Sequence, residues 1–175
     1  RISGERTVEK LRQYRAARDL VGPLVKGFPI MDALSSLAFY EQGIADIPVC
    51  AVDHIEPFLA HGVPELWAYY CTGQAVNVTN RFFAMPTART RIFGVQMFKY
   101  DIKGCLHWGY NFYNSHLSLY PIDPFFITDA GEVFPGGDPF LVYPAPDGTP
   151  WGSLRLMAME IAMSDVRALR LLSRR

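Results

Sequence analysis

The sequence has few cysteines, and their arrangement suits neither cross-linking nor zinc binding. Cys50, Cys71 and Cys105 are the three cysteines among 175 residues, an odd number without a Cys-x-x-Cys pair. Each falls in or beside an apolar segment, which is typical of buried, reduced thiols. The sequence therefore indicates no disulfide scaffold. The unpaired cysteines slightly favour the cytoplasm, and nothing else in the sequence indicates a location.

An excess of charge and long apolar runs are also missing. Lys plus Arg and Asp plus Glu number 17 each, so the net charge is zero. This balance gives no reason to expect nucleic acid or an anionic membrane surface as a partner. No apolar run reaches the length of a membrane span. The sequence begins at Arg1 without an initiator methionine or a signal peptide, so we expect a chain trimmed at its N-terminus.

Several widespread catalytic patterns are absent. No Gly-x-Ser-x-Gly elbow indicates a serine hydrolase, and the four histidines show neither His-x-His nor His-Glu-x-x-His spacing. The aspartates of the second half lack the spacing of an EF-hand loop. No glycine-rich phosphate turn follows any expected strand. We therefore predict no metal site and no cofactor.

What the sequence has is a large apolar share arranged in alternating patterns. Half of the residues are hydrophobic, which is enough for a sizeable core. Helical spacing predicts helices over 7–21, 35–42, 53–59, 87–100 and 153–172, with Thr7 and Asp53 as N-caps of the first and third. Short β-rich runs predict strands over 28–31, 47–52, 66–71 and 105–110, with an extra strand at 141–143. One apolar stripe of the last helix contains Leu154, Met157, Ile161, Ala168 and Leu172.

The alternation predicts an α/β fold with a parallel sheet. A complete (β/α)₈ barrel needs roughly 250 residues, and four strands are half of its sheet. We predict a single domain over residues 1–175, the C-terminal half of a TIM-type barrel, with strands centred near Ile30, Val49, Ala68 and Leu106. A doubly wound sheet is the alternative. The bare edges of the outer strands would need cover from a missing N-terminal half or from a second copy.

Candidate binding residues follow the expected strands. In a barrel, chemistry lies at the carboxyl ends of the strands and in the loops after them. Those positions hold Asp32, Asp53, Tyr69, Tyr70, Trp108, Tyr110 and Asn111. Aromatic rings pack on the C–H faces of sugars, while carboxylates and amides bind hydroxyl groups. The set predicts a carbohydrate substrate, although each aromatic residue alone would equally suit the core.

Two further features surround these positions. Arg81, Arg89 and Arg91 form a positive cluster, which is either a solvated helix face or a means by which Arg81 orients a carboxylate or a substrate oxygen. The segment 111–139 is long and rich in aromatic residues and proline. Long loops in compact domains are usually functional or disordered, and this composition favours an ordered lid.

Five segments, taken in order, carry a family resemblance. They are Trp67-Ala68-Tyr69-Tyr70-Cys71, Asn80-Arg81-Phe82, Leu106-His107-Trp108-Gly109-Tyr110-Asn111, Gly137-Asp138-Pro139-Phe140-Leu141-Val142-Tyr143-Pro144, and the opening of the last helix, Ser153-Leu154-Arg155-Leu156, with Asp165 and Ala168-Leu169 further along it. Together they resemble the glycoside hydrolase family 123-like catalytic domain over essentially the whole chain.

The resemblance implies a (β/α)₈ barrel that cleaves β-linked N-acetylhexosamines by substrate-assisted catalysis. The acetamide oxygen of the sugar attacks the anomeric carbon, an Asp orients the acetamide, and the adjacent Glu protonates the leaving oxygen. In this chain Glu5 stands at the position of the acid and Gly4 at that of the Asp. Glu5 could instead be a carboxylate favoured by a helix N-terminus.

The departure at Gly4 leaves three hypotheses for the chain. It is a glycosidase in its full-length form, a non-catalytic carbohydrate-binding or degenerate homologue, or a folding fragment without activity of its own. We expect the isolated 175-residue chain to be inactive, because Gly4 supplies no carboxylate for the acetamide.

Overall fold

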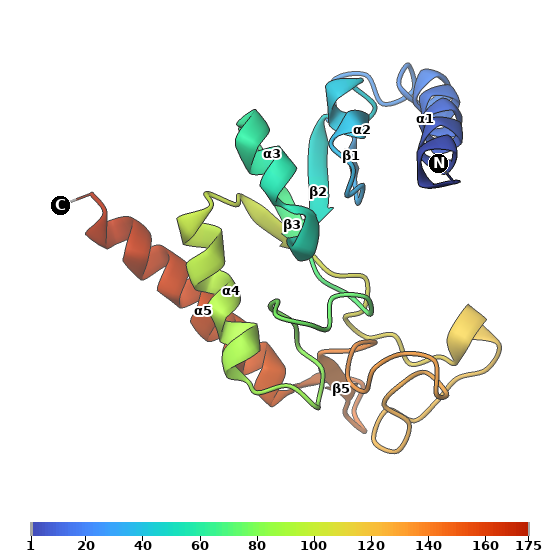
Figure 1. Cartoon of the computed structure of the whole chain (residues 1–175). Coiled ribbons are helices and arrows are strands. Elements are labelled where there is room, and N and C mark those ends of the chain that lie inside the picture. Colours follow the sequence, from blue (N-terminus) through green and yellow to red (C-terminus); the bar gives the residue numbers. More distant parts are fainter. Residues whose placement is uncertain (1, 175) are drawn as a thin grey trace. The chain divides into compact units, whose positions relative to one another are not determined.

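The computed structural model describes residues 2–174, with side chains from Thr7 to Arg174. Contacts within the chain group it into two compact units, Arg1–Tyr69 and Tyr70–Arg175, which are described separately below (Figure 1). Both contain helices and strands, so the predicted mixed α/β class is confirmed. Among the described helices, none is long and apolar enough to cross a membrane.

The first unit is built on three parallel strands. Its elements are α1 (Ile2–Val21), β1 (Met31–Asp32), α2 (Ala38–Glu41), β2 (Ile47–Ala51), the 3₁₀ turn η1 (Val52–His54), α3 (Glu56–His61) and β3 (Trp67–Tyr69). Met31 lies opposite Ile47, and Val49 lies opposite Trp67, both in parallel register. Strand β2 is buried from Pro48 to Ala51, as a strand covered on both faces requires. The parallel pairing predicted for these three strands is confirmed.

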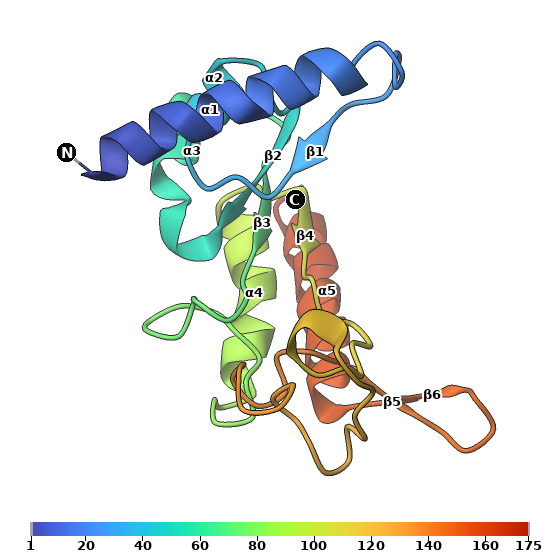
Figure 2. The same ribbon diagram turned by 90° about the vertical axis from the view of Figure 1, so that its right-hand side faces the viewer.

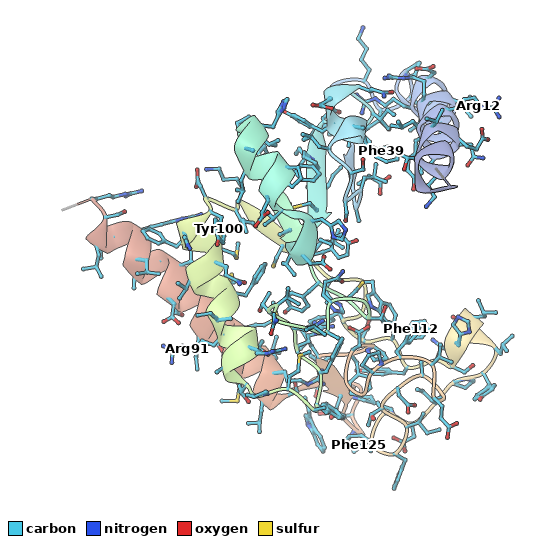
Figure 3. All side chains as sticks on the ribbon, viewed as in Figure 1. Arg12, Phe39, Arg91, Tyr100, Phe112 and Phe125 are labelled. Carbon is cyan, nitrogen blue, oxygen red and sulfur yellow. The ribbon has the colours of Figure 1, made fainter. Side chains whose placement is uncertain are left out.

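An apolar cluster joins the helices of this unit. Phe39 of α2 is buried together with Leu34, Ile44 and Ala45, and Leu11 of α1 packs against the cluster. The Tyr14 ring meets the Phe39 ring edge-on, with centroids 5.2 Å apart, and Figure 3 labels Phe39 at this place. Helix α1 therefore attaches to α2 through a narrow apolar face.

Both predicted helix caps of this unit are wrong. Helix α1 begins at Ile2, so Thr7 lies inside it. Helix α3 begins at Glu56 after Ile55, because Pro57 in the first turn has a fixed φ that suits a helix start. Asp53 lies in the preceding 3₁₀ turn, where its Oδ1 is 2.9 Å from Nδ1 of His54.

The second unit contains two long helices and a large irregular region. Its elements are α4 (Ala88–Lys99), β4 (Gly104–Leu106), the 3₁₀ turn η2 (His116–Ser118), β5 (Val142–Pro144), β6 (Pro150–Gly152) and α5 (Leu154–Leu172). Helices α4 and α5 lie side by side in both views (Figures 1 and 2). A Cβ atom at Gly94 would collide with the backbone of Ala162, so the two helices approach closely at this point.

The close approach determines which face of α5 is buried. The buried face of α5 contains Arg155, Ala158, Ala162 and Val166. The apolar stripe seen in the sequence is exposed instead, with Leu154 at 78% and Met157 at 56% exposure. Small residues pack here because helix backbones in contact leave no room for large side chains. Ser153 caps α5 by accepting a hydrogen bond from the Leu156 amide, 3.2 Å.

The region between β4 and α5 is irregular but tied together. Strand β4 ends at Leu106, earlier than predicted, so the residues from His107 to Asn111 follow it in a loop. A bridge between Asn111 and Phe140 closes the ends of the segment 111–139. The predicted extra strand is present as β5, and it pairs antiparallel with β6, which the sequence analysis did not anticipate.

Candidate functional site

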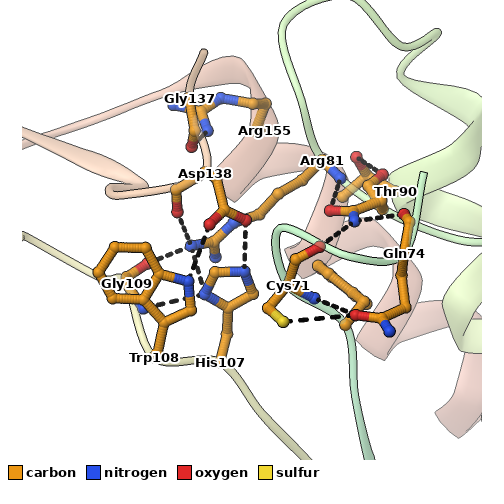
Figure 4. A network of polar contacts seen from close by, with 12 residues as sticks. Cys71, Gln74, Arg81, Thr90, His107, Trp108, Gly109, Gly137, Asp138 and Arg155 are labelled. Carbon is orange, nitrogen blue, oxygen red and sulfur yellow. Dashed lines mark hydrogen bonds and ion pairs between the residues drawn. The ribbon is translucent and has the colours of Figure 1, made fainter. Parts of the chain in front are cut away.

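A buried carboxylate lies at the centre of the polar network in the second unit (Figure 4). Asp138 has no exposed surface, and its Oδ2 accepts a hydrogen bond from Nε1 of Trp108, 2.8 Å. The indole itself is 41% exposed. Trp108 is therefore partly open to solvent while its polar edge is bonded to a buried carboxylate.

His107 contacts the other oxygen of this carboxylate. Its Nδ1 accepts from the Gly109 amide at 3.0 Å and lies 2.8 Å from Nη2 of Arg81, which has only protons to donate. The ring proton therefore belongs on Nε2, which lies 3.2 Å from Oδ1 of Asp138. Neither of these two atoms has a well-aligned partner among the described residues. Burial lowers the pKa of His107, against the opposing effect of Asp138, and keeps the imidazole neutral.

Arg81 connects the backbone segment that contains Gly109 with the segment that contains Asp138. Its side chain is buried, and Nη2 donates to the carbonyl oxygens of Gly109 and Asp138, the latter at 3.0 Å. Burial lowers the pKa of Arg81 to about 10, which still leaves a cation at neutral pH. A Cβ at Gly109 would lie 2.6 Å from the Pro139 carbonyl oxygen, so only glycine fits between the segments.

A second buried arginine lies beside the same segment. Nη1 of Arg155 donates to the Gly137 carbonyl, and its guanidinium lies over the rings of Phe83 at 4.5 Å and Phe140 at 5.6 Å. Burial lowers the pKa of this guanidinium too, against the effect of Tyr143. The two buried cations are thus held mainly by carbonyl oxygens and aromatic faces.

Three rings contact the Trp108 indole. The rings of Phe112 and Phe134 meet it edge-on at 5.3 and 5.0 Å, and the His107 ring is stacked at 6.2 Å. Tyr110 is 52% exposed and Asn111 is also exposed. An open indole, a phenol and an amide therefore follow one another after β4.

A cleft of about 530 Å³ borders the network. Arg81, His107 and Tyr110 line one part of it, and its apolar wall includes Leu156, Met159 and Met163. A mostly apolar wall with a few polar groups is typical of pockets for small organic molecules. Among the residues described, no group of three metal-ligating side chains occurs.

Two of the predicted binding residues lie in the interior. Tyr70 is 2% exposed, packs on Phe93 and His107, and donates to the sulfur of Met159, 3.5 Å. Burial raises the pKa of its hydroxyl to about 12. Tyr70 packs in the core, and Arg81 donates to backbone carbonyls. Neither side chain has an exposed surface for a ligand.

The first unit contains the other predicted binding residues. Oδ1 of Asp32 accepts from the Ala33 amide, 2.7 Å, and Asp53 is exposed beside His54. The Tyr69 hydroxyl lies 3.1 Å from Oγ of Ser35. Whether these side chains share a cleft with Trp108 stays a prediction, because Trp108 belongs to the second unit.

The proposed acid lies at the start of α1. The backbone of Gly4 and Glu5 is helical, and their side-chain positions lie outside the described residues. The catalytic assignment of Glu5 therefore stays a prediction.

The sequence analysis missed the roles of Asp138 and His107. Asp138 was one of several scattered aspartates, and His107 was one of four histidines without ligand spacing. A signal did exist, because Gly137-Asp138-Pro139 is one of the segments that carry the resemblance, and an acidic residue next to apolar ones needs a partner when buried.

Comparison with known protein families identifies a match. The sequence model of the family described as "Glycoside hydrolase 123, catalytic domain" matches residues 2–172, nearly the whole chain. No curated protein matches the sequence.

Proposed function

Because this chain belongs to the family of glycoside hydrolase 123 catalytic domains, we propose that it acts on β-linked N-acetylhexosamines as the C-terminal half of a (β/α)₈ barrel. The parallel pairing of β1, β2 and β3 supports this architecture. So does the alternation of helices and strands along the chain.

The open indole of Trp108 carries the proposal. It follows β4, where barrel enzymes place their binding residues, and exposed Tyr110 and Asn111 come next. A flat apolar ring beside a phenol and an amide suits the mixed surface of a sugar. Asp32, Asp53 and Tyr69 would complete the site from the first unit, whereas buried Tyr70 and Arg81 would support it.

Glu5 would be the general acid of the reaction. The acetamide oxygen of the substrate would form a bond to the anomeric carbon as the bond from that carbon to the leaving oxygen breaks. Glu5 would give its proton to the leaving oxygen, and water would then open the resulting oxazolinium ion. Gly4 has no carboxylate to orient the acetamide, so this step would depend on another group.

Sugar binding by Trp108 is the direct test. Trp108→Ala should weaken the binding of N-acetylglucosamine or N-acetylgalactosamine by roughly 5- to 150-fold, the scale of one lost apolar contact of ~1–3 kcal/mol. Trp151→Ala, which removes another exposed indole of the same unit, should leave the affinity unchanged. Equal affinities of the wild-type protein and Trp108→Ala would exclude Trp108 as the platform.

A non-catalytic carbohydrate-binding role is the second candidate, and Gly4 favours it. Gly4→Asp should raise the hydrolysis of aryl β-N-acetylhexosaminides if the machinery is otherwise intact, and Glu5→Gln should abolish that gain. Sugar binding without turnover in any of these variants would favour the binding role.

Completion of the sheet is part of the same proposal. The remaining strands of a barrel, or a second copy of the chain, would cover the open strand edges and exposed apolar side chains such as Ile92 and Met157. Light scattering of the purified chain would detect a second copy as a doubled mass.

A further inference from the structure

We infer that Asp138 is a positioning residue, which fixes the Trp108 indole in the orientation that a sugar ring requires. The inference rests on the proposed function for its sugar-binding part. The contact between the two side chains stands on the geometry alone.

The first observation is the unequal burial of the two partners. Asp138 is fully buried, whereas the Trp108 indole, which donates to it over 2.8 Å, is 41% exposed. A charged acceptor makes this a stronger hydrogen bond than a neutral one would be. An indole held at its nitrogen cannot turn about its long axis without losing that bond. The exposed part of the indole is therefore fixed in direction, which reduces the ordering cost of stacking a ligand on it.

The second observation is that the carboxylate itself is held in place. The backbone carbonyl of Asp138 accepts a hydrogen bond from Arg81, and the backbone of Gly109 lies close to the carbonyl oxygens of Pro139 and Asp138. The segment with the carboxylate and the segment with the indole are thus fixed to each other (Figure 4).

The third observation is the tautomer of His107. With its Nδ1 occupied by two donors, His107 carries its proton on Nε2, which lies 3.2 Å from Oδ1 of Asp138 without the alignment of a hydrogen bond. One carboxylate oxygen is therefore bonded to the N–H of Trp108, and the other lies close to the N–H of His107. An amide in place of the carboxylate would turn its NH₂ group toward one of these donors, so Asp138→Asn should disturb the arrangement with little change of shape.

The indole N–H signal in NMR spectra tests the contact. The chain has three tryptophans, and Trp108→Phe identifies the Trp108 signal as the one that disappears. In Asp138→Asn we expect this signal to move upfield while the signals of Trp67 and Trp151 stay. The matched control Glu132→Gln changes an exposed carboxylate of the same loop region and should move none of them.

Sugar titration tests the consequence. Asp138→Asn should weaken N-acetylhexosamine binding by about tenfold in the wild-type background. It should have no further effect in a Trp108→Phe background, because the influence of Asp138 passes through the indole N–H. A loss of affinity that is equal in both backgrounds would overturn the positioning role.

The unmodified protein gives an independent test if Asp138→Asn fails to fold. The Trp108 Nε1 proton should exchange slowly with solvent, because it is bonded to a buried carboxylate. Fast exchange would overturn the inference. If neither N-acetylglucosamine nor N-acetylgalactosamine binds but the Trp108 Nε1 proton exchanges slowly, the proposed function fails and the contact between Asp138 and Trp108 stands.

Discussion

The two units of the chain are stabilised in different ways. The first has an apolar cluster around Phe39, and its ion pair between Arg18 and Asp46 lies near the surface, with 22% and 38% of the two side chains exposed. The second buries Arg81, Asp138 and most of Arg155. Apolar packing gives the first unit its cohesion, whereas the second depends on polar contacts whose loss would leave charges in the interior.

Removal of a buried cation should have the largest effect and would test this contrast most directly. Arg81→Met should lower the free energy of unfolding by about 3–5 kcal/mol, because the carbonyl groups of Gly109 and Asp138 would lose a buried donor and the Asp138 carboxylate would lose a nearby cation. Urea unfolding followed by circular dichroism measures the change. Arg91→Met, which removes an exposed partner of Asp165, is the control and should unfold at nearly the wild-type midpoint. Equal stability of Arg81→Met and the wild-type protein would contradict the contrast.

A tight backbone contact should give the next largest effect. Gly109→Ala would place a Cβ within 2.6 Å of the Pro139 carbonyl oxygen, where neither backbone segment can easily move. We expect a loss of about 1–3 kcal/mol, the usual cost of overpacking. Gly73→Ala is the control, because a Cβ at that position has open space. Similar midpoints of thermal unfolding for the two variants would show that the contact is not tight.

The buried histidine should make stability depend on pH in the second unit. Burial lowers the pKa of folded His107 below the ordinary value of 6.5, so the unfolded chain binds the proton more readily. Stability is fully present above pH 6.5 and decreases as the pH falls below it, until the folded-state pKa is reached. The slope contributed is at most about 1.4 kcal/mol per pH unit.

His107→Asn isolates this contribution. The amide oxygen can accept from Gly109 and Arg81 as Nδ1 does, but it does not titrate. Between pH 7 and pH 5 the variant should lose less stability than the wild-type protein, in urea unfolding at each pH. His54→Asn, at an exposed position, should follow the wild-type curve. Parallel curves for His107→Asn and the wild-type protein would contradict the prediction.

The ion pair of the first unit should give the smallest effect. Arg18→Met should cost about 1 kcal/mol or less, because water already screens the pair. The cost should shrink further in 0.5 M salt, whereas that of Arg81→Met should not. If Arg18→Met lowered the free energy of unfolding as much as Arg81→Met, the contrast between the two units would not hold.

The sequence predicted the elements that have local signals and missed features that depend on contacts between distant residues. Strands β2 and β3 and helix α5 were expected near their observed positions, because continuous apolar runs and helical spacing are local signals. The apolar spacing in α5 did not identify its buried face. That face is set by the contact between Gly94 and Ala162, which lie on different helices, and helical periodicity cannot reveal such a contact.

The site was predictable only in its exposed part. Trp108, Tyr110 and Asn111 were found from their place after a strand, and all three are partly or fully open. Tyr70 is a tyrosine like Tyr110 and also follows a strand, yet it lies in the core. Burial depends on which face of the strand a side chain occupies, and a shift of one residue reverses it. The role of Asp138 was not predicted because its partners are 30 or more residues away in sequence.

The bridge between Asn111 and Phe140 has a consequence for how this family can diversify. The segment between these residues begins and ends at the same point of the unit, so insertions within it need not displace the helices. Loop-closure entropy grows slowly with length, by only about 0.6 kcal/mol for each doubling. Relatives could therefore lengthen the exposed part of this segment at low cost to stability, whereas its contacts to Trp108, Arg81 and Arg155 would have to stay. Grafts that keep both bridge residues together with Gly137 and Asp138 should be the tolerated ones in directed evolution.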